Sequence, residues 1–239
     1  MGFFLTILVF STFSLVYVMD RTAAEKGRKY YEDAGYIIWD IQTEQKVVAL
    51  TFDDGPHKTH TEQILNLLDQ HDAKGTFFIV GQLAEKYPEI VRRMYESGHE
   101  IANHTYTHPY TKSVSKVMEE IQQTSDSLYG ITGFSPTLFR PVEGYYTERL
   151  VNEVAREGYK LVMWSWHLDT EDWKNPGVNN IVNKVLNGVE QGDVVLFHDG
   201  GGNREQTVHA LEKIVPELKK QGYTFITISE MLKLQQARK

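Results

Sequence analysis

The chain has 239 residues, with 25 Lys and Arg against 32 Asp and Glu, so its formal net charge at pH 7 is −7. This acidic balance argues against a nucleic-acid partner or an anionic lipid surface, and the 41% of hydrophobic residues excludes a wholly disordered chain. The sequence contains no cysteine, which excludes a disulfide scaffold, a thiol nucleophile and a sulfur-ligated metal site, so any metal must be held by nitrogen and oxygen.

The first element in the chain is an uncharged, apolar run over residues 3–19. As an α-helix this run would span about 25 Å, which is close to the hydrocarbon thickness of a bilayer. No basic residue precedes the run and no clear cleavage site follows it, which favours a membrane anchor over residues 1–20 rather than a cleaved signal segment. Residues 21–45 are polar and show no strong period, and we expect a linker there.

From residue 46 to residue 232, short apolar runs alternate with helical patterns. Strands are predicted over residues 47–52, 75–80, 100–103, 137–140, 160–164, 193–198 and 223–227. Helices are predicted over residues 61–70, 84–97, 113–130, 148–157, 179–190 and 205–221. These make about seven βα units, and helical crossovers of this length join parallel strands. The pattern predicts one α/β domain shaped as a (β/α) barrel, followed by a polar tail over residues 233–239.

Two adjacent carboxylates, Asp53 and Asp54, follow the first strand of this domain. Functional groups of parallel α/β proteins collect at the carboxyl ends of the strands. Two carboxylates after a buried run are costly unless they are paired or bind a cation. The following Gly55 and Pro56 are also typical of a simple acidic turn, so this motif alone leaves both interpretations open.

Two histidines, His104 and His108, follow the third strand of this domain. Imidazoles four residues apart face one point if the backbone makes a helical turn, which Pro109 would end at His108. Such a pair alone is common at a protein surface. Combined with a carboxylate from a neighbouring strand end, it gives two histidines and one carboxylate with open positions left for water, which is the pattern of a catalytic zinc site.

Two other strand ends also carry polar residues. His198 ends a buried strand, and near Asp169 or Asp172 its imidazole would be an oriented general acid. Arg140 ends another strand and would pair with one of the two aspartates after the first strand, because a bidentate guanidinium keeps a carboxylate ionised and aimed. These strand ends together indicate a catalytic metal site with an acid–base group beside it.

Five motifs therefore stand in order along the chain. They are Thr51-Phe52-Asp53-Asp54-Gly55-Pro56, His104-Thr105-Tyr106-Thr107-His108-Pro109, Arg140 with Gly144, Asp169-Thr170-Glu171-Asp172-Trp173, and Leu196-Phe197-His198-Asp199. These motifs resemble those of the polysaccharide deacetylases, which form carbohydrate esterase family 4, and the resemblance covers roughly residues 46–232. It implies a distorted, incomplete (β/α)7-type barrel that removes N-acetyl groups from a glycan with one divalent metal ion.

The resemblance also implies a role for each motif residue. Asp54, His104 and His108 would hold the metal, with Zn²⁺ expected first and Co²⁺, Ni²⁺ or Mn²⁺ as alternatives. Asp53 would be the general base that takes a proton from the attacking water, and Arg140 would hold Asp53 in place.

On the opposite side of the scissile bond, the resemblance implies a general acid. His198 would protonate the departing amine, and Asp172 would orient its other ring nitrogen. Trp173 and Leu196 would wall the pocket for the acetyl methyl group.

The third motif departs from the Arg-x-Pro-Tyr-Gly pattern of the family, because Val142 stands where Pro is usual and Glu143 where an aromatic is usual. The backbone amide of Glu143 would still bind the oxyanion, since an amide needs no particular side chain, and we expect the chemistry to be intact. The Glu143 carboxylate either favours an unusual glycan as the substrate or simply extends into solvent. Tyr145 either stacks on a sugar ring or packs in the loop. Glu143 and Tyr145 are thus candidate substrate-binding residues.

The sequence predicts an extracytoplasmic deacetylase, membrane-anchored through its N-terminal segment or secreted, that acts as a monomer on N-acetylglucosamine residues of cell-wall peptidoglycan. Chitooligosaccharide, xylan or another exopolysaccharide is an alternative substrate. A different class of function is a surface glycan-binding protein that keeps the fold without turnover. The complete set of motif residues argues against this last alternative.

Overall fold

The computed structural model of the chain describes residues 26–237, and the anchor or signal segment predicted over residues 1–20 lies outside them. Within the described part, parallel strands form one sheet in the order β1-β6-β5-β4-β3-β2-β7, with β8 paired to β2. The strands are β1 (Ile37–Ile38), β2 (Val47–Gly55), β3 (Gly75–Ile79), β4 (Glu100–Asn103), β5 (Leu138–Phe139), β6 (Lys160–Val162), β7 (Val194–His198) and β8 (Thr224–Phe225). The predicted incomplete (β/α)7-type barrel is confirmed, as a curled half-barrel.

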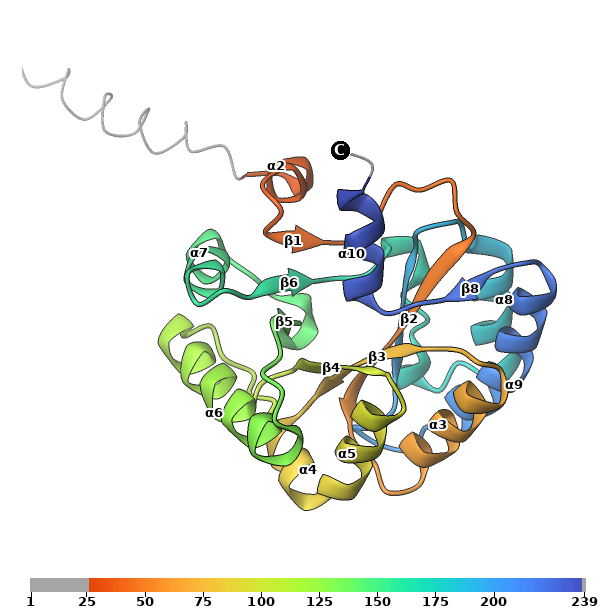
Figure 1. Cartoon of the computed structure of the whole chain (residues 1–239), viewed down its shortest axis with the longest axis horizontal. Coiled ribbons are helices and arrows are strands. Elements are labelled where there is room, and N and C mark those ends of the chain that lie inside the picture. Colours follow the sequence, from red (N-terminus) through yellow and green to blue (C-terminus); the bar gives the residue numbers. More distant parts are fainter. Residues whose placement is uncertain (1–25, 238–239) are drawn as a thin grey trace, which may run out of the picture.

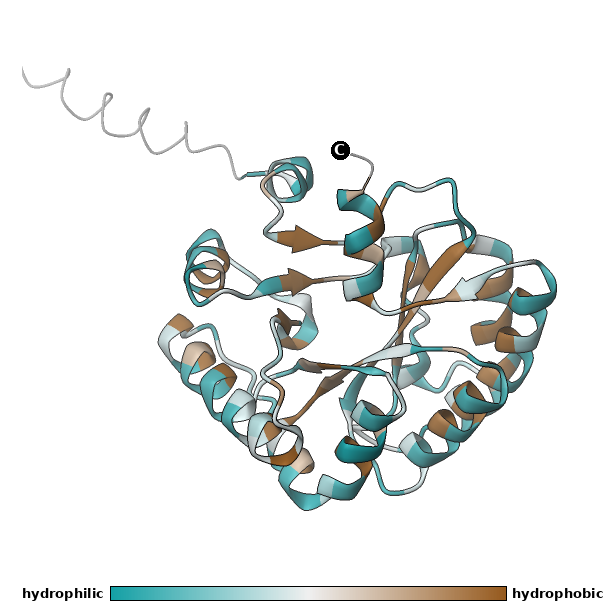
Figure 2. Cartoon of the chain, viewed as in Figure 1, coloured by the Kyte–Doolittle hydropathy of each residue, from teal (hydrophilic) through white to brown (hydrophobic). Residues whose placement is uncertain are grey.

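Helices surround this sheet (Figure 1). They are α2 (Arg28–Asp33), α3 (His60–Gln70), α4 (Gly81–Lys86), α5 (Pro88–Glu96), α6 (Val114–Thr132), α7 (Glu148–Arg156), α8 (Val178–Gly188), α9 (Glu205–Lys220) and α10 (Ile228–Gln236). Short 3₁₀ turns occur at Val142–Gly144, Trp166–Leu168 and Asp172–Lys174. In Figure 1 the helices α6, α4, α5, α3, α9 and α8 form an arc around the strands, and Figure 2 shows apolar residues concentrated on the strands and on parts of these helices.

The strand β2 shows how the two faces of the sheet are used. Leu50 and Phe52 point outward and are fully buried against the surrounding helices. Val47 and Ala49 point inward and belong to a separate apolar cluster that fills the half-barrel. Because side chains alternate along a strand, Asp53 also faces inward, so the interior changes from apolar to polar toward the carboxyl ends of the strands.

The helix α10 covers the amino end of the half-barrel. Ile228 and Met231 are fully buried within the inward-facing apolar cluster. The N–H of Ile228 donates to Thr76 Oγ1 at 3.1 Å, and the N–H of Ser229 donates to Glu100 Oε2 at 3.2 Å, which ties the helix to the beginnings of β3 and β4. The amino end of the half-barrel is therefore covered by α10, and the polar carboxyl ends of the strands lie at the opposite end.

The prediction of a linker over residues 21–45 is wrong from residue 28 onward, because this segment is part of the fold. It forms α2 and β1, and β1 pairs with β6 at the edge of the sheet. Tyr31 and Trp39 are only 4% and 1% exposed. A two-residue strand is too short to show a period in the sequence, and its position depends on burying these aromatic side chains.

Two other boundaries also differ from the prediction. The helix expected over residues 84–97 is divided into α4 and α5, because Pro88 has no N–H to continue α4 and instead begins α5. The polar tail expected over residues 233–239 is helical as far as Gln236, the last residue of α10.

Within residues 26–237, no helix has the length and apolar character needed to cross a bilayer.

Candidate active site

The two carboxylates at the end of β2 both reach one site because the strand contains a bulge. Asp53 pairs in register with His198 of β7, but the register with β3 shifts between Asp53 and Gly55. The extra residue, Asp54, has a φ of 72°. Neighbouring residues of a regular strand point to opposite faces, so the bulge is what turns Asp54 toward the site. Oxygens of Asp53 and Asp54 lie 3.9 and 3.4 Å from Nε2 of the same residue, His104.

Arg140, directly after β5, is fully buried and holds Asp53. Its Nη1 donates to Asp53 Oδ1 at 2.7 Å and to Thr51 Oγ1 at 3.0 Å. Its Nε and Nη2 donate to the carbonyl oxygens of Val162 and Met163 at 3.0 and 2.7 Å. The contact with Asp53 therefore uses one nitrogen and is not bidentate, because main-chain carbonyls occupy the others. Hydrogen bonds around the whole guanidinium fix the direction of the Asp53 carboxylate.

His104 and His108 lie in the loop after β4, and their imidazoles converge on Asp54. The two Nε2 atoms lie 3.4 and 3.1 Å from Asp54 Oδ1. The helical turn predicted for this pair is wrong, because the loop is irregular, with φ values of 70° at Thr105 and 55° at His108. Such left-handed backbone is unfavourable for residues other than glycine, so the surroundings must hold the loop in place.

Asp54, His104 and His108 form a group of possible metal ligands, whose ligand atoms all lie within 4.8 Å of one another. His104 Nδ1 lies 2.8 Å from the carbonyl oxygen of Arg140, and only a protonated Nδ1 makes this hydrogen bond, so Nε2 of the neutral ring keeps a lone pair for a cation. Burial disfavours the charge of Asp54, but the two imidazoles hold the pKa of its carboxyl well below its usual range. An ionised carboxylate and two imidazoles fit a divalent cation.

Glu120 of α6 anchors the loop that carries both histidines. Its side chain is buried, and Oε2 accepts from the N–H of Tyr106 at 2.9 Å and of Thr107 at 2.6 Å. Burial disfavours the charge, but the hydrogen bonds from Thr107 hold the pKa of Glu120 below its usual value. Sequence reasoning missed this residue, because nothing in a helical pattern separates Glu120 from its exposed neighbour Glu119.

Replacing Glu120 with Gln is expected to weaken the affinity for a divalent cation about 10- to 100-fold, as is usual for residues that position metal ligands. The amide keeps the shape of the side chain but removes the charged acceptor that two backbone N–H groups share. The measurement is Zn²⁺ affinity by competition with a chelator, with the Tm of the metal-free protein recorded alongside. Glu119→Gln is the matched control, because Glu119 pairs with Lys116 on the same helix and, among the residues described, with no backbone N–H of the histidine loop. Equal Zn²⁺ affinity in both variants would contradict the anchoring role.

His198 ends β7 next to Asp53, and Asp172 holds its ring. His198 Nδ1 lies 2.7 Å from Asp172 Oδ1, while Asp172 Oδ2 accepts from the His198 N–H at 2.9 Å and from Thr207 Oγ1 at 2.6 Å. Burial disfavours the cation, but the contact with Asp172 raises the pKa of His198 to about 9. The structure thus places Asp172, rather than Asp169, against the ring. A protonated imidazole with a fixed orientation is suited to donate a proton.

Asp199 is a buried carboxyl to which sequence reasoning assigned no role. Its Oδ2 accepts from Thr61 Oγ1 at 2.5 Å, and its Oδ1 has no hydrogen-bond partner among the residues described. Burial raises the pKa of Asp199 to about 7. A Cβ at Gly55 would lie 2.1 Å from Asp199 Oδ2, so glycine is required there for β2 and the end of β7 to approach so closely. No periodic or motif signal in the sequence indicates this contact.

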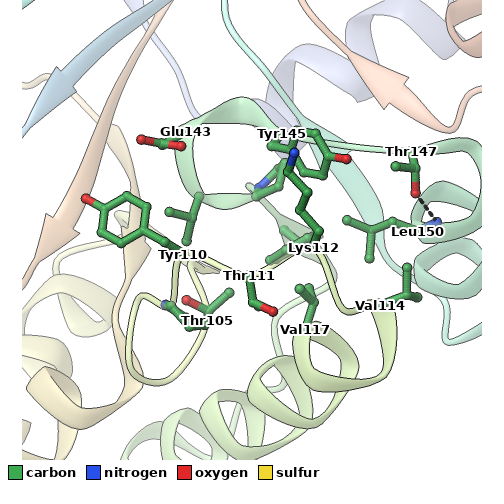
Figure 3. A pocket seen from close by; sticks show the side chains of 14 residues that line it. Thr105, Tyr110, Thr111, Lys112, Val114, Val117, Glu143, Tyr145, Thr147 and Leu150 are labelled. Carbon is green, nitrogen blue, oxygen red and sulfur yellow. Dashed lines mark hydrogen bonds between the residues drawn. The ribbon is translucent and has the colours of Figure 1, made fainter.

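The four candidate substrate-binding residues lie in different settings. Trp173 and Tyr145 are exposed, at 49% and 43%. Leu196, two residues before His198 on β7, is buried. Glu143 is exposed and has a φ of 56° in the turn after β5. Glu143 and Tyr145 both line one pocket, between the loop after β4 and the turn after β5, as Figure 3 shows. Trp173 and Leu196 do not line this pocket.

A family model described as polysaccharide deacetylase matches residues 40–162 of the chain. The chain is 46% identical over 211 residues to a peptidoglycan-N-acetylglucosamine deacetylase of Bacillus cereus, and the match covers 86% of this chain and 97% of that protein. It is 35% identical over 200 residues to the peptidoglycan-N-acetylmuramic acid deacetylase PdaC of Bacillus subtilis, covering 83% of this chain and 41% of that protein.

Solved structures show the same similarity. The crystal structure of the peptidoglycan N-acetylglucosamine deacetylase Bc1960, in complex with 4-naphthalen-1-yl-N-oxidanyl-benzamide, superposes with a TM-score of 0.81 at 36% identity, covering 86% of this chain and 97% of that chain. A family 4 pseudoenzyme from Bacillus anthracis superposes with a TM-score of 0.75 at 28% identity, covering 83% of this chain and 69% of that chain. Because a pseudoenzyme shares the fold, turnover must be argued from the residues of the site.

Proposed function

The chain belongs to the polysaccharide deacetylase family, and from this premise we propose that it hydrolyses the N-acetyl groups of N-acetylglucosamine residues in cell-wall peptidoglycan. The observation that carries the proposal is the convergence of Asp53, Asp54, His104, His108 and His198 at the open end of the half-barrel. Several relatives of the chain are named as peptidoglycan deacetylases, which supports this substrate.

Asp54, His104 and His108 would hold one divalent cation, which we propose to be Zn²⁺, with Co²⁺, Ni²⁺ or Mn²⁺ as alternatives. A cation there would polarise the acetamide carbonyl and make a water molecule easier to ionise. The chain itself supplies the proton transfers that hydrolysis of an amide requires, one on each side of the scissile bond.

Asp53 is the proposed general base, which takes a proton from the attacking water. Arg140 binds Asp53 Oδ1, so the other oxygen, Oδ2, is the one that faces the ligand group, 3.9 Å from His104 Nε2. The buried guanidinium also places a positive charge beside this carboxylate, 2.7 Å from Oδ1. Arg140 therefore both positions the Asp53 carboxylate and supplies the positive charge beside it.

His198 is the proposed general acid, which donates a proton to the nitrogen of the departing amine, because an amide anion is too poor a leaving group. Asp172 occupies Nδ1, so the proton that His198 transfers is the one on Nε2. Leu196 lies two residues before His198 on the same strand, and Trp173 follows Asp172 in the chain. From these positions we assign both side chains to the wall around the acetyl methyl group.

The backbone N–H of Glu143 is the proposed donor to the carbonyl oxygen as it becomes negative. The N–H groups of Gly144 and Tyr145 donate to the carbonyls of Pro141 and Val142 at 2.9 and 3.1 Å, whereas that of Glu143 has no acceptor in the described part of the chain. The φ of 56° at Glu143 holds this amide out of the helical hydrogen bonding. Its side chain is not needed for this role.

We further propose that the enzyme acts as a monomer outside the cytoplasm, where peptidoglycan lies. The apolar run over residues 3–19 supports attachment to the membrane or secretion. The alternative from another class is a glycan-binding protein without turnover, and the pseudoenzyme among the relatives gives it a precedent.

Acetate release by the metal-loaded protein tests this function. The substrates are purified peptidoglycan, chitooligosaccharide and acetylated xylan, at matched acetyl concentrations. We expect the fastest release from peptidoglycan. Release from only one of the other two glycans would overturn the peptidoglycan assignment, and no release from any of them would favour the glycan-binding alternative.

A further inference from the structure

A pocket of about 170 Å³ lies beside the proposed catalytic group, and of its lining only the backbone N–H of Glu143 has a part in the mechanism described above. It begins where the catalytic residues end, because Pro109 follows His108 and Pro141 follows Arg140, and both prolines line it. Its apolar wall consists of Val114, Val117, Phe139, Pro141, Val142 and Leu150. A substituent on the glycan chain whose acetamide reacts is therefore close enough to enter this pocket.

One cation lines the pocket, and it has no acidic partner. Lys112 lies with its ammonium 5.4 Å from the centre of the Tyr145 ring, and no carboxylate within residues 26–237 pairs with it. Of the four other lysines that lie over an aromatic ring in residues 26–237, Lys26 and Lys174 pair with a glutamate, whereas Lys46 and Lys86 do not. Lys112 is thus available to a negatively charged or carbonyl group of a ligand.

The acidic residue of the pocket lies apart from this cation. Figure 3 shows Glu143 on the side of Tyr110, while Lys112 extends toward Tyr145. Tyr110 and Tyr145 are 77% and 43% exposed, so two aromatic faces are accessible at the rim. The pocket combines an apolar wall, a cation at one side and aromatic rings, which suits a small group that carries both a methyl and a carboxyl.

We propose that this pocket binds the lactyl group of an N-acetylmuramic acid next to the sugar that is deacetylated. The inference rests on the proposed function and names the part of peptidoglycan that the site recognises. The lactyl methyl would contact the apolar wall, and its carboxyl, free or joined to the peptide, would meet the Lys112 ammonium. A polymer of N-acetylglucosamine carries only a hydroxyl at the corresponding oxygen, and it offers neither contact.

Replacing Lys112 with Gln tests the proposal through substrate discrimination. The two substrates are an oligosaccharide of alternating N-acetylglucosamine and N-acetylmuramic acid with free lactyl carboxyls, and a chitooligosaccharide of equal length. Loss of a partly exposed ion pair is expected to raise the KM for the lactyl-bearing substrate about fivefold relative to the KM for the chitooligosaccharide. Lys112→Glu is expected to raise this ratio further, because it places two negative charges together.

Lys46→Gln is the matched control. Lys46 also lies near an aromatic ring, 5.8 Å from the centre of Tyr223, but it precedes β2 and so lies at the opposite end of the half-barrel. The ratio of the two KM values is expected to stay at the wild-type value in this control. An unchanged ratio in both Lys112 variants would overturn the lactyl assignment. That result would leave the proposed function standing as long as the wild-type protein deacetylates peptidoglycan, so the two failures are distinguishable.

Discussion

Replacing Asp53 with Asn is expected to lower the kcat for acetate release from peptidoglycan by about 100- to 10,000-fold, the usual contribution of a positioned base. Asn has nearly the same shape and keeps an oxygen that can accept the hydrogen bond from Arg140 Nη1. Its amide cannot accept the proton of the attacking water. The substitution therefore removes the proposed base with little change in the geometry around it, and kcat is measured with saturating substrate and metal.

The same substitution is also expected to destabilise the protein, since Arg140 is fully buried and loses the one carboxylate that pairs with it within residues 26–237. Breaking a buried pair in this way typically costs about 3–5 kcal/mol. The Tm is therefore measured first, and kcat is compared at a temperature where both proteins are folded. Asp69→Asn is the control, because Asp69 pairs with Arg93 at the surface, away from the site. A folded Asp53→Asn protein with the wild-type kcat would refute the assignment of the base.

The sequence was sufficient to predict that Asp53 and His198 lie at strand ends, because each follows a strongly apolar run. Asp53 and His198 come at the ends of β2 and β7, whose buried residues give a clear strand signal. Parallel strands bring their carboxyl ends to one edge, so residues far apart in the chain could be expected to meet there. The resemblance of the ordered motifs to those of a known family assigned a role to each carboxylate and each histidine. These roles stay predictions.

Other parts of the site depend on tertiary contacts that leave no pattern in the sequence. The bulge at Asp54 is set by the register between β2 and β3, and the irregular loop at His108 is held by Glu120 from a distant helix. Neither feature changes the local hydrophobic period. For the same reason α2 and β1 resembled a linker, since their stability comes from burying Tyr31 and Trp39 rather than from local propensity.

Removing the metal is the second change for which we expect a very large effect. Without a cation on Asp54, His104 and His108, no electrophile at the site would polarise the acetamide carbonyl. Asp53 and His198 could then only transfer protons, and proton transfer alone does not hydrolyse an amide at a useful rate. The effect should be reversible, because the half-barrel is held by its apolar clusters and hydrogen bonds rather than by the ligand group. The Tm of the metal-free protein tests that last point.

Two histidine variants show whether recovery depends on this group. His108→Ala removes one ligand and should stay inactive at a Zn²⁺ concentration that restores the wild type. His209→Ala is the matched control, because His209 is exposed and pairs with Glu212 on α9, outside the site. It should recover as the wild type does.

The most direct measurement is acetate release from purified peptidoglycan by one preparation assayed as isolated, after chelation, and after Zn²⁺ is added back. We predict that release falls to the background rate on chelation and returns when one Zn²⁺ per chain is bound. Release that continues at the original rate after the metal has been removed would contradict the assignment of Asp54, His104 and His108 as the metal ligands of a deacetylase.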